Sequence, residues 1–253
     1  MGAFALRDVV DECYWCGRKA TSAEHVPPKC IFPELKDSEG INYRKNLITV
    51  PSCDQHNLVK TKDDEYLLLL LVVNTLRNEV GKQQFDTKLM RLIRQKPWFV
   101  SNVIGNANSI HMFDTDDTLI GTGKAFQVDI KRYDSIIEHV ARALWFHEYG
   151  LRFRGRFEIL INGLRYNSVR SIHKMYAVYE KELFRIQQTL LFKGENPDVF
   201  RYVFTYGRKG RVHLSMIFYG FQMLFIVMEA SCSWSWGMNM KRRRHNKSLE
   251  LSP

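Results

Sequence analysis

Apolar and polar residues follow two different patterns along the chain, and the change falls at about residue 65. Before this point, turn-forming residues interrupt the chain at short intervals, at Gly17, Pro27, Pro28, Pro33, Gly40 and Pro51. Elements in this part must therefore be short. Residues 47–50, three of which are β-branched, predict a strand that ends at Pro51, with residues 22–26 as its partner across a long loop. A helix is expected to begin near Asp54 and to carry His56 and Asn57 on its first turns.

Longer periodic segments follow residue 65. Residues 133–149 place apolar side chains at the spacing of an amphipathic helix, which Gly150 should end. Other helices are expected over residues 66–80, 88–94 and 171–192, the second of them ended by Pro97. Strands are expected over 127–130, 156–161 and 203–206. Residues 212–228 are rich in aromatic and β-branched side chains, as in a hairpin edge or in buried strands.

These patterns predict an α+β protein that is divided into three parts. We expect a compact N-terminal module over residues 1–65, a larger mixed α+β domain over 66–237 and a basic C-terminal tail over 238–253. The chain after residue 65, at about 185 residues with the tail included, is long enough for a core of its own. The tail carries the run Lys241-Arg242-Arg243-Arg244-His245, and such a run is usually solvated and only sometimes holds phosphate.

Two ligand pairs lie in the N-terminal module, Cys13-x2-Cys16 and Cys53-x2-His56. A spacer of two residues lets a tight turn aim both side chains at one ion, and two such pairs are typical of a structural zinc site. Closing this site would help a segment that is too short to bury a large core. The alternative is that the cysteines are buried free thiols. Cys30 and Cys232 have no partner at this spacing and are expected to be packed thiols.

Composition narrows the class of protein. Five cysteines in 253 residues, an odd and low count, argue against a disulfide framework and favour a reducing compartment. The first residues become charged too early for a secretory signal, and the apolar runs 67–73 and 216–228 are shorter than the ~20 residues that span a bilayer. We therefore expect a cytoplasmic protein that does not enter the membrane. The net charge of +10 is compatible with nucleic acid as a partner.

One stretch resembles a known family. The residues Glu24-His25, Asn46-Leu47 and Cys53-x2-His56-Asn57-x2-Lys60 look like the HNH endonuclease family in its zinc-braced ββα-metal form, over about residues 13–65. The resemblance implies a zinc-stabilised ββα-metal module that hydrolyses DNA phosphodiester bonds, followed by a domain that recognises a substrate, partner or trigger. Nucleases of this type often act in bacterial restriction or anti-phage defence. Residues 139–150 also resemble a stretch of small bacterial HNH proteins, which implies no chemistry.

The resemblance assigns roles to individual residues. His25 would be the general base that takes a proton from the attacking water, for which a neutral imidazole is suited. Glu24 and Asn57 would hold a catalytic Mg²⁺ or Mn²⁺ through oxygen atoms, and Asn46 would orient His25. Cys13, Cys16, Cys53 and His56 would hold the structural Zn²⁺.

Two departures from the family pattern bear on these roles. The family commonly has Asp at the position of Glu24, so the additional methylene could change metal affinity. Many relatives have two cysteines where this chain has Cys53 and His56. A competing assignment therefore makes His56 the last histidine of the motif and leaves zinc with three ligands. We favour His56 on zinc, because structural sites usually have four protein ligands.

Other functions stay open at this stage. The module could bind nucleic acid or protein through its zinc fold without cleaving, or it could be an HNH nuclease that acts on RNA. One HNH site cuts one strand, so a double-strand break would need a homodimer or two events, and the C-terminal domain could also take an activating partner.

Several other polar residues have plainer interpretations. His139 and His147 are about 12 Å apart on a helix, too far for one ion, so they are expected to be ordinary helix residues. The acidic run Asp114, Asp116 and Asp117 is expected to be a solvated turn, and Asp63-Asp64 to cap a helix that begins near Tyr66. Trp15 is expected to pack against the first ligand pair.

Overall fold

The computed structural model describes residues 12–57, 61–74, 77–113, 118–162, 181, 185, 188–207 and 211–230. Within these residues the chain is a mixture of helices and antiparallel sheets, as an α+β protein should be. The helix expected over 171–192 falls almost entirely outside the described residues. Lys60, the acidic run 114–117, Cys232 and the tail 238–253 also lie outside them.

The N-terminal part contains a two-stranded sheet and a short helix. Strand β1 (Ser22–His25) pairs antiparallel with β2 (Thr49–Ser52), and helix α1 (Asp54–Asn57) follows directly. Two single 3-10 turns, η1 (Lys29–Ile31) and η2 (Leu35–Asp37), lie in the connection between the strands. Strand β2 continues through Pro51, which the sequence pattern placed after the strand. The missing amide of proline is tolerated because β2 pairs with β1 alone and has an edge without a ladder partner.

A group of helices follows. Helix α2 (Thr61–Val73) is succeeded by α3 (Glu79–Gln84), a π-helical segment η4 (Phe85–Leu89), α4 (Met90–Gln95) and α5 (Pro97–Ile104). The residues from Leu67 to Val72 are all buried, so the second half of α2 is apolar on every side within the core. The expected domain boundary after residue 65 falls inside this helix.

The expected bounds of these helices were partly wrong. The helix expected over 66–80 begins earlier and ends earlier, so Asp63 and Asp64 lie in its first turn rather than before it. Helix α4 ends at Gln95, just before Pro97, as the sequence pattern predicted. Pro97 also opens α5, because its missing amide would have no intrahelical partner at that position. The observed α3, η4 and α4 extend the helix that was expected only over 88–94.

Helix α6 (Ile130–Tyr149) confirms the amphipathic pattern. The Asp129 side chain accepts a hydrogen bond from the Arg132 amide at 3.0 Å, and Gly150 ends the helix with φ +64°. The strand expected over 127–130 was wrong for this reason. These residues alternate as a strand does, but they lead into the N-terminal cap of α6. The Asp129 side chain satisfies a helical amide there, which favours a helix over a strand. Among the described residues, no helix is both long and apolar enough to cross a membrane.

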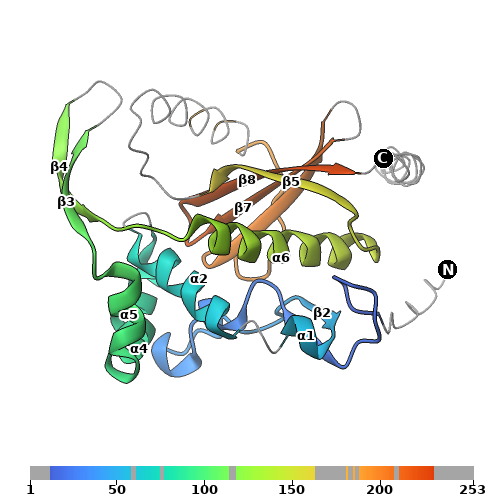
Figure 1. Cartoon of the computed structure of the whole chain (residues 1–253), viewed down its shortest axis with the longest axis horizontal. Helices are drawn as coiled ribbons and strands as arrows, with labels where there is room; N and C mark the ends of the chain where they lie inside the picture. The colour runs from blue at the N-terminus through green and yellow to red at the C-terminus, as the bar shows by residue number, and fades with distance from the viewer. Residues whose placement is uncertain are drawn as a thin grey trace.

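The C-terminal part is a four-stranded antiparallel sheet in the order β5-β8-β7-β6, built from β5 (Gly155–Asn162), β6 (Phe200–Tyr206), β7 (Arg211–Phe218) and β8 (Gln222–Ala230). The strands expected over 156–161 and 203–206 and the hairpin over 212–228 are confirmed. The ribbon β3 (Asn108–Phe113) and β4 (Leu119–Ala125) was not expected. Among the described strands, β3 and β4 pair only with each other, and they extend from one end of the molecule (Figure 1).

Helix α6 lies between two layers. Figure 1 shows the four-stranded sheet on one side of it and the layer with β2, α1 and α2 on the other. The helix buries nine side chains, among them Trp145, whose ring meets Phe153 and Phe204 edge to face. Both parts of the chain therefore share one hydrophobic cluster, with α6 at its centre.

Candidate metal centre

The first ligand pair lies on a tight turn. A bridge between Glu12 and Lys19 brings the ends of the turn together, and the Cys13 amide donates to the Arg18 carbonyl at 2.7 Å. The Gly17 amide donates to the Cys13 carbonyl at 2.9 Å. Gly17 has φ +76°, a left-handed conformation that glycine adopts without strain. This turn directs Cys13 and Cys16 to the same side.

The second ligand pair lies where β2 passes into α1. The amides of His56 and Asn57 donate to the Cys53 carbonyl at 2.9 and 3.0 Å, which closes one helical turn. Residues three apart in a helix share a face, so the turn brings the Cys53 thiol and the His56 ring together. The carbonyl of Pro51 accepts from the Tyr14 amide at 2.9 Å and so joins the two ligand pairs through their backbones.

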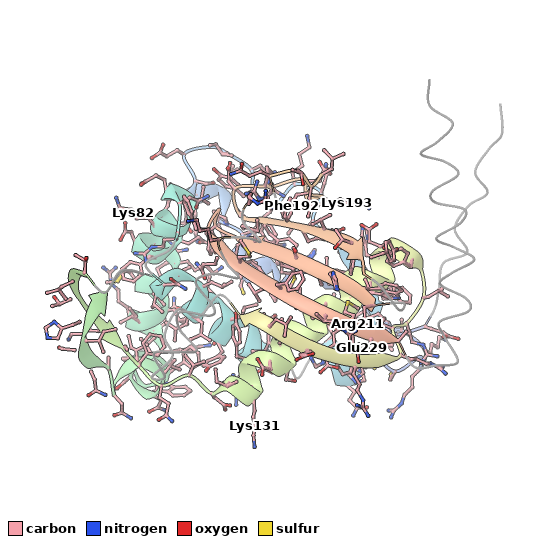
Figure 2. The ribbon with its side chains drawn as sticks, turned by 90° about the horizontal axis from the view of Figure 1, so that it is seen from above. Lys82, Lys131, Phe192, Lys193, Arg211 and Glu229 are labelled. Atoms are coloured by element: carbon pink, nitrogen blue, oxygen red, sulfur yellow. The ribbon has the colours of Figure 1, made fainter. Side chains whose placement is uncertain are left out.

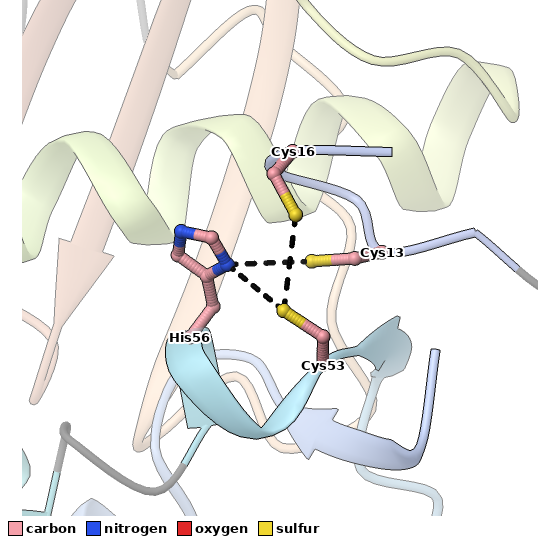
Figure 3. Close-up of side chains that lie close together, drawn as sticks. All are labelled: Cys13, Cys16, Cys53 and His56. Carbon is pink, nitrogen blue, oxygen red and sulfur yellow. Dashed lines mark hydrogen bonds between the residues drawn. The ribbon is translucent and has the colours of Figure 1, made fainter. Parts of the chain in front are cut away.

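Cys13, Cys16, Cys53 and His56 form one cluster, in which the four ligand atoms lie within 4.8 Å of one another (Figure 3). The Sγ atoms of Cys16 and Cys53 are 3.8 Å apart, and His56 Nδ1 is 3.7 Å from Cys13 Sγ and 3.1 Å from Cys53 Sγ. Ligands in a tetrahedron of bonds about 2.3 Å long are about 3.8 Å apart, whereas a disulfide needs about 2.05 Å. The donor set and its spacing could hold a zinc ion.

The electrostatics of the cluster favour the metal-binding form of Cys13 and of His56 but not that of Cys16, whose pKa is raised by burial. Burial acts to raise the pKa of Cys13, but backbone amides of Cys16, Trp15 and Cys53 point at the sulfur and bring this pKa below its usual value. Burial, and then the charge of Arg18, lower the pKa of His56. A partly stabilised thiolate and a neutral imidazole are the forms that bind a metal ion.

Helix α6 covers the metal cluster from the side of the C-terminal part. Trp15, between the first two ligands, stacks on His139 with ring centroids 3.9 Å apart. The guanidinium of Arg142 lies 4.7 Å from the Trp15 ring centre and donates to the Phe153 carbonyl at 2.6 Å. Trp15 was expected to pack against its own turn, and its ring also lies 5.9 Å from that of His56. The contact with α6 could not be found by sequence spacing, because it joins positions 124 residues apart.

The cluster also adjoins Glu24 and Asn57, the residues predicted to hold a catalytic ion. Asn57 follows His56 and donates from Nδ2 to Ser22 Oγ at 2.8 Å. Ser22 and Glu24 share one face of β1, because side chains alternate along a strand. Glu24 is 5% exposed, and its Oε1 accepts a hydrogen bond from Tyr14 at 3.4 Å. Tyr14 was not predicted from the sequence as a residue of the site, although its position next to the ligand Cys13 could have indicated that it lies there.

His25 and Asn46 lie differently. His25 is the last residue of β1 and follows Glu24, so strand alternation turns its side chain toward the opposite face. Burial, then the charges of Lys29 and Arg44, lower its pKa. Its buried Nδ1 has no hydrogen-bond partner among the described residues. Asn46 is exposed with φ +52°, and no hydrogen bond to His25 is seen between these two described side chains.

Other polar residues have structural roles. The Cys30 thiol lies outside the cluster and donates to the Asp64 carbonyl at 3.3 Å, as a packed thiol would, and burial raises the pKa of Cys30 to about 12. Asp63 accepts from Arg132 at 2.7 Å and joins α2 to α6.

Comparison of the chain with protein-family models, with curated proteins and with solved structures finds no match.

Proposed function

We propose that this protein is a metal-dependent HNH endonuclease that hydrolyses phosphodiester bonds in DNA. The observation that carries the proposal is the order of elements around the cluster. Strand β1 ends in Glu24-His25, β2 returns antiparallel to it, and α1 starts at once and carries Asn57 back to β1 through Ser22. Three elements thus surround a Cys3His set that could hold zinc, as the resemblance to the ββα-metal form implies.

The proposed chemistry assigns the base to His25. A neutral imidazole takes a proton from water, the water oxygen attacks phosphorus, and the bond from phosphorus to the 3′ oxygen breaks, with a solvent proton going to the leaving oxygen. The lowered pKa of His25 keeps the ring neutral at physiological pH. The same cations that lower this pKa, Lys29 and Arg44, provide positive charge for a phosphate beside the ring.

Glu24 and Asn57 would hold the catalytic ion. Because Asn57 donates its amide nitrogen to Ser22, its carbonyl oxygen stays available as a ligand atom. A carboxylate and an amide oxygen are ligands that suit Mg²⁺ or Mn²⁺, and such an ion supplies Lewis-acid stabilisation of the phosphate charge. Zinc would be held separately by Cys13, Cys16, Cys53 and His56, which assigns His56 to the structural site.

A second candidate function is a nucleic-acid-binding module that does not cleave. Two observations favour it: Glu24 is 5% exposed, and Asn46 is turned to solvent rather than toward His25. A binding module needs the zinc fold and the net charge of +10, but it needs neither an accessible carboxylate nor an oriented base. The proposal also includes three alternatives. The substrate could be RNA, the biological context could be restriction or anti-phage defence, and the protein could act as a homodimer or with an activating partner.

The decisive experiment compares the unmodified protein with His25→Ala on supercoiled plasmid, linear DNA and RNA, with Mg²⁺ or Mn²⁺. The nuclease proposal expects nicking that EDTA stops and that His25→Ala reduces at least about 100-fold, as loss of a general base does. Zinc content and retention on DNA should not change in this variant. DNA retention without cleavage by the unmodified protein would decide for the binding module, and cleavage of RNA alone would change the substrate.

A further inference from the structure

A pocket of about 400 Å³ lies away from the metal cluster, where the first turns of α2 and α5 meet the segment that leads into α6. Its volume falls within the range of small-molecule sites, which is about 300–1,000 Å³. Neither the zinc fold nor the proposed hydrolysis uses these residues. Lys62, at the rim, follows Asn57 by five positions in the chain, so the pocket is joined to the candidate site by a short segment.

The pocket offers an aromatic surface. Tyr66 and Phe99 are buried in its lining, whereas the Trp98 ring is 62% exposed. Trp98 also meets Phe99 edge to face, with ring centroids 6.2 Å apart. An exposed indole beside a polar pocket is suited to stack on a flat ring, and stacking of a nucleobase on an aromatic side chain stabilises binding by about 1–3 kcal/mol.

Three cations line the same pocket, Lys62, Lys96 and Arg132. Two are held in place. Lys96 Nζ donates to the Glu65 carboxylate at 2.6 and 2.9 Å. Arg132 lies 4.3 Å from the Tyr66 ring centre, and its guanidinium also donates to Asp63 at 2.7 Å and to the Lys62 carbonyl at 2.8 Å. The lining contains two acids, and both already accept hydrogen bonds from the protein, Glu65 from Lys96 and Asp129 from the Arg132 amide. An ammonium has three donor hydrogens, so Lys96 can also bind an anion.

Two side-chain amides complete the polar lining, those of Asn102 and Gln127, both exposed. Amide groups donate and accept at once and pair with the edges of nucleobases. The Trp98 ring, the two side-chain amides and the three cations together match a ligand that has a flat heterocycle and a phosphate. We propose that this pocket binds a nucleotide, with its base on Trp98 and its phosphate toward Lys62, Lys96 and Arg132.

The ligand could come from two sources with the same chemistry, a free nucleotide or one nucleotide of a nucleic-acid strand. Titration of the full-length protein with AMP, GMP, CMP and UMP, and with a tetranucleotide, separates them. Saturable binding of a mononucleotide identifies a free nucleotide. Saturable binding of the tetranucleotide without any of the four mononucleotides identifies a strand.

Binding should be measured by calorimetry. Tryptophan fluorescence is unsuitable, because Trp98→Ala removes the fluorescent side chain at the pocket. Trp98→Ala should weaken binding about tenfold through lost stacking, and Lys62→Gln several-fold through lost charge. Lys82→Gln is the matched control, since this exposed lysine on α3 lies outside the pocket lining (Figure 2), and its affinity should stay unchanged. Circular dichroism should confirm that each variant is folded.

The proposal is overturned if neither the mononucleotides nor the tetranucleotide bind saturably, or if Trp98→Ala and Lys62→Gln bind as tightly as Lys82→Gln. It does not rest on the proposed hydrolysis. His25→Ala should bind nucleotides as the unmodified protein does, and a protein that fails to cleave DNA can still bind them. Loss of one activity therefore does not imply loss of the other.

Discussion

Trp15 stacks on His139 with ring centroids 3.9 Å apart and ring planes 6° from parallel. The first residue lies between two candidate zinc ligands, and the second lies on the helix that supports the four-stranded sheet. Arg142, one turn after His139, lies over both Trp15 and Phe157 of β5, at 4.7 and 4.6 Å from the ring centres. The metal cluster is therefore packed into the whole fold and is not an independent finger.

This stacking predicts that Trp15→Ala destabilises the whole protein. Loss of the indole removes the contact with His139 and the cation–π contact with Arg142, and should lower the free energy of unfolding by about 2–3 kcal/mol in the presence of zinc. Trp15→Phe keeps a flat ring and should lose less than half as much. Denaturant unfolding measures both. Equal stability of Trp15→Ala and the unmodified protein would show that the stack contributes nothing.

Removal of one ligand should remove zinc. Cys16→Ser replaces a thiolate by a hydroxyl, a poor zinc ligand, so metal analysis should fall from about one zinc per chain to little or none. Because structural zinc contributes to folding, the melting temperature should fall by ~10 °C or more. The matched control is Cys30→Ser, whose thiol lies outside the cluster and only donates to a carbonyl. Similar zinc contents in the two variants would contradict the assigned ligand set.

Lys29 should contribute to DNA affinity. This exposed residue lies close enough to His25 to lower the pKa of its ring, so it is placed to meet a phosphate there. Lys29→Gln should weaken binding to duplex DNA several-fold and reduce the salt dependence of the binding constant by about one unit of slope. Anisotropy titrations at several salt concentrations measure this. Lys131→Gln, an exposed lysine on α6, is the control, and equal effects of both substitutions would count against a phosphate contact at Lys29.

The connection between β1 and β2 should depend on pH through Glu34. Its carboxylate accepts from Lys88 at 2.9 Å, and Lys88 first and Lys36 second lower its pKa from 4.5 to about 2. A depressed carboxyl pKa stabilises the fold above the ordinary value, and this contribution is lost as pH falls from about 4.5 to about 2. Glu34→Gln should therefore lower the free energy of unfolding at pH 7 by an amount on the order of 1 kcal/mol, since solvent screens the pair.

The same comparison at several pH values checks the sign of this effect. The difference in stability between Glu34→Gln and the unmodified protein should shrink as pH falls from about 4.5 to about 2, because the Glu34 carboxylate is progressively protonated over this range. Glu79→Gln is the control, because Glu79 is 91% exposed and its ion pair with Lys82 is 3.7 Å long, so no measurable change is expected. A difference that grows as pH falls would exclude the proposed role of Glu34.

Local pattern was sufficient where one segment determines its own structure. Helix α6 followed from the spacing of its apolar residues and from Gly150, and β7 and β8 from their β-branched and aromatic residues. It failed where neighbouring signals compete. Residues 127–130 alternate as a strand does, but the Asp129 side chain caps α6, and Asp63 and Asp64, which were expected to cap a helix, lie in the first turn of α2.

The candidate site also has features that the sequence determined and features that it did not. By itself, the sequence determined which residues could be zinc ligands, because Cys13-x2-Cys16 and Cys53-x2-His56 are defined by short spacers that a single turn converts into a common direction. It also determined the α+β class through periodicity. These are properties of segments a few residues long, in which bond geometry limits the outcome.

Only the tertiary structure decided how these segments meet. It buried Glu24 against Tyr14, turned Asn46 to solvent, stacked Trp15 on His139 and formed a pocket between three helices. Each of these depends on contacts between residues far apart in the chain. Such contacts are selected by how side chains of different segments fill a shared core, and no pattern within one segment specifies that packing.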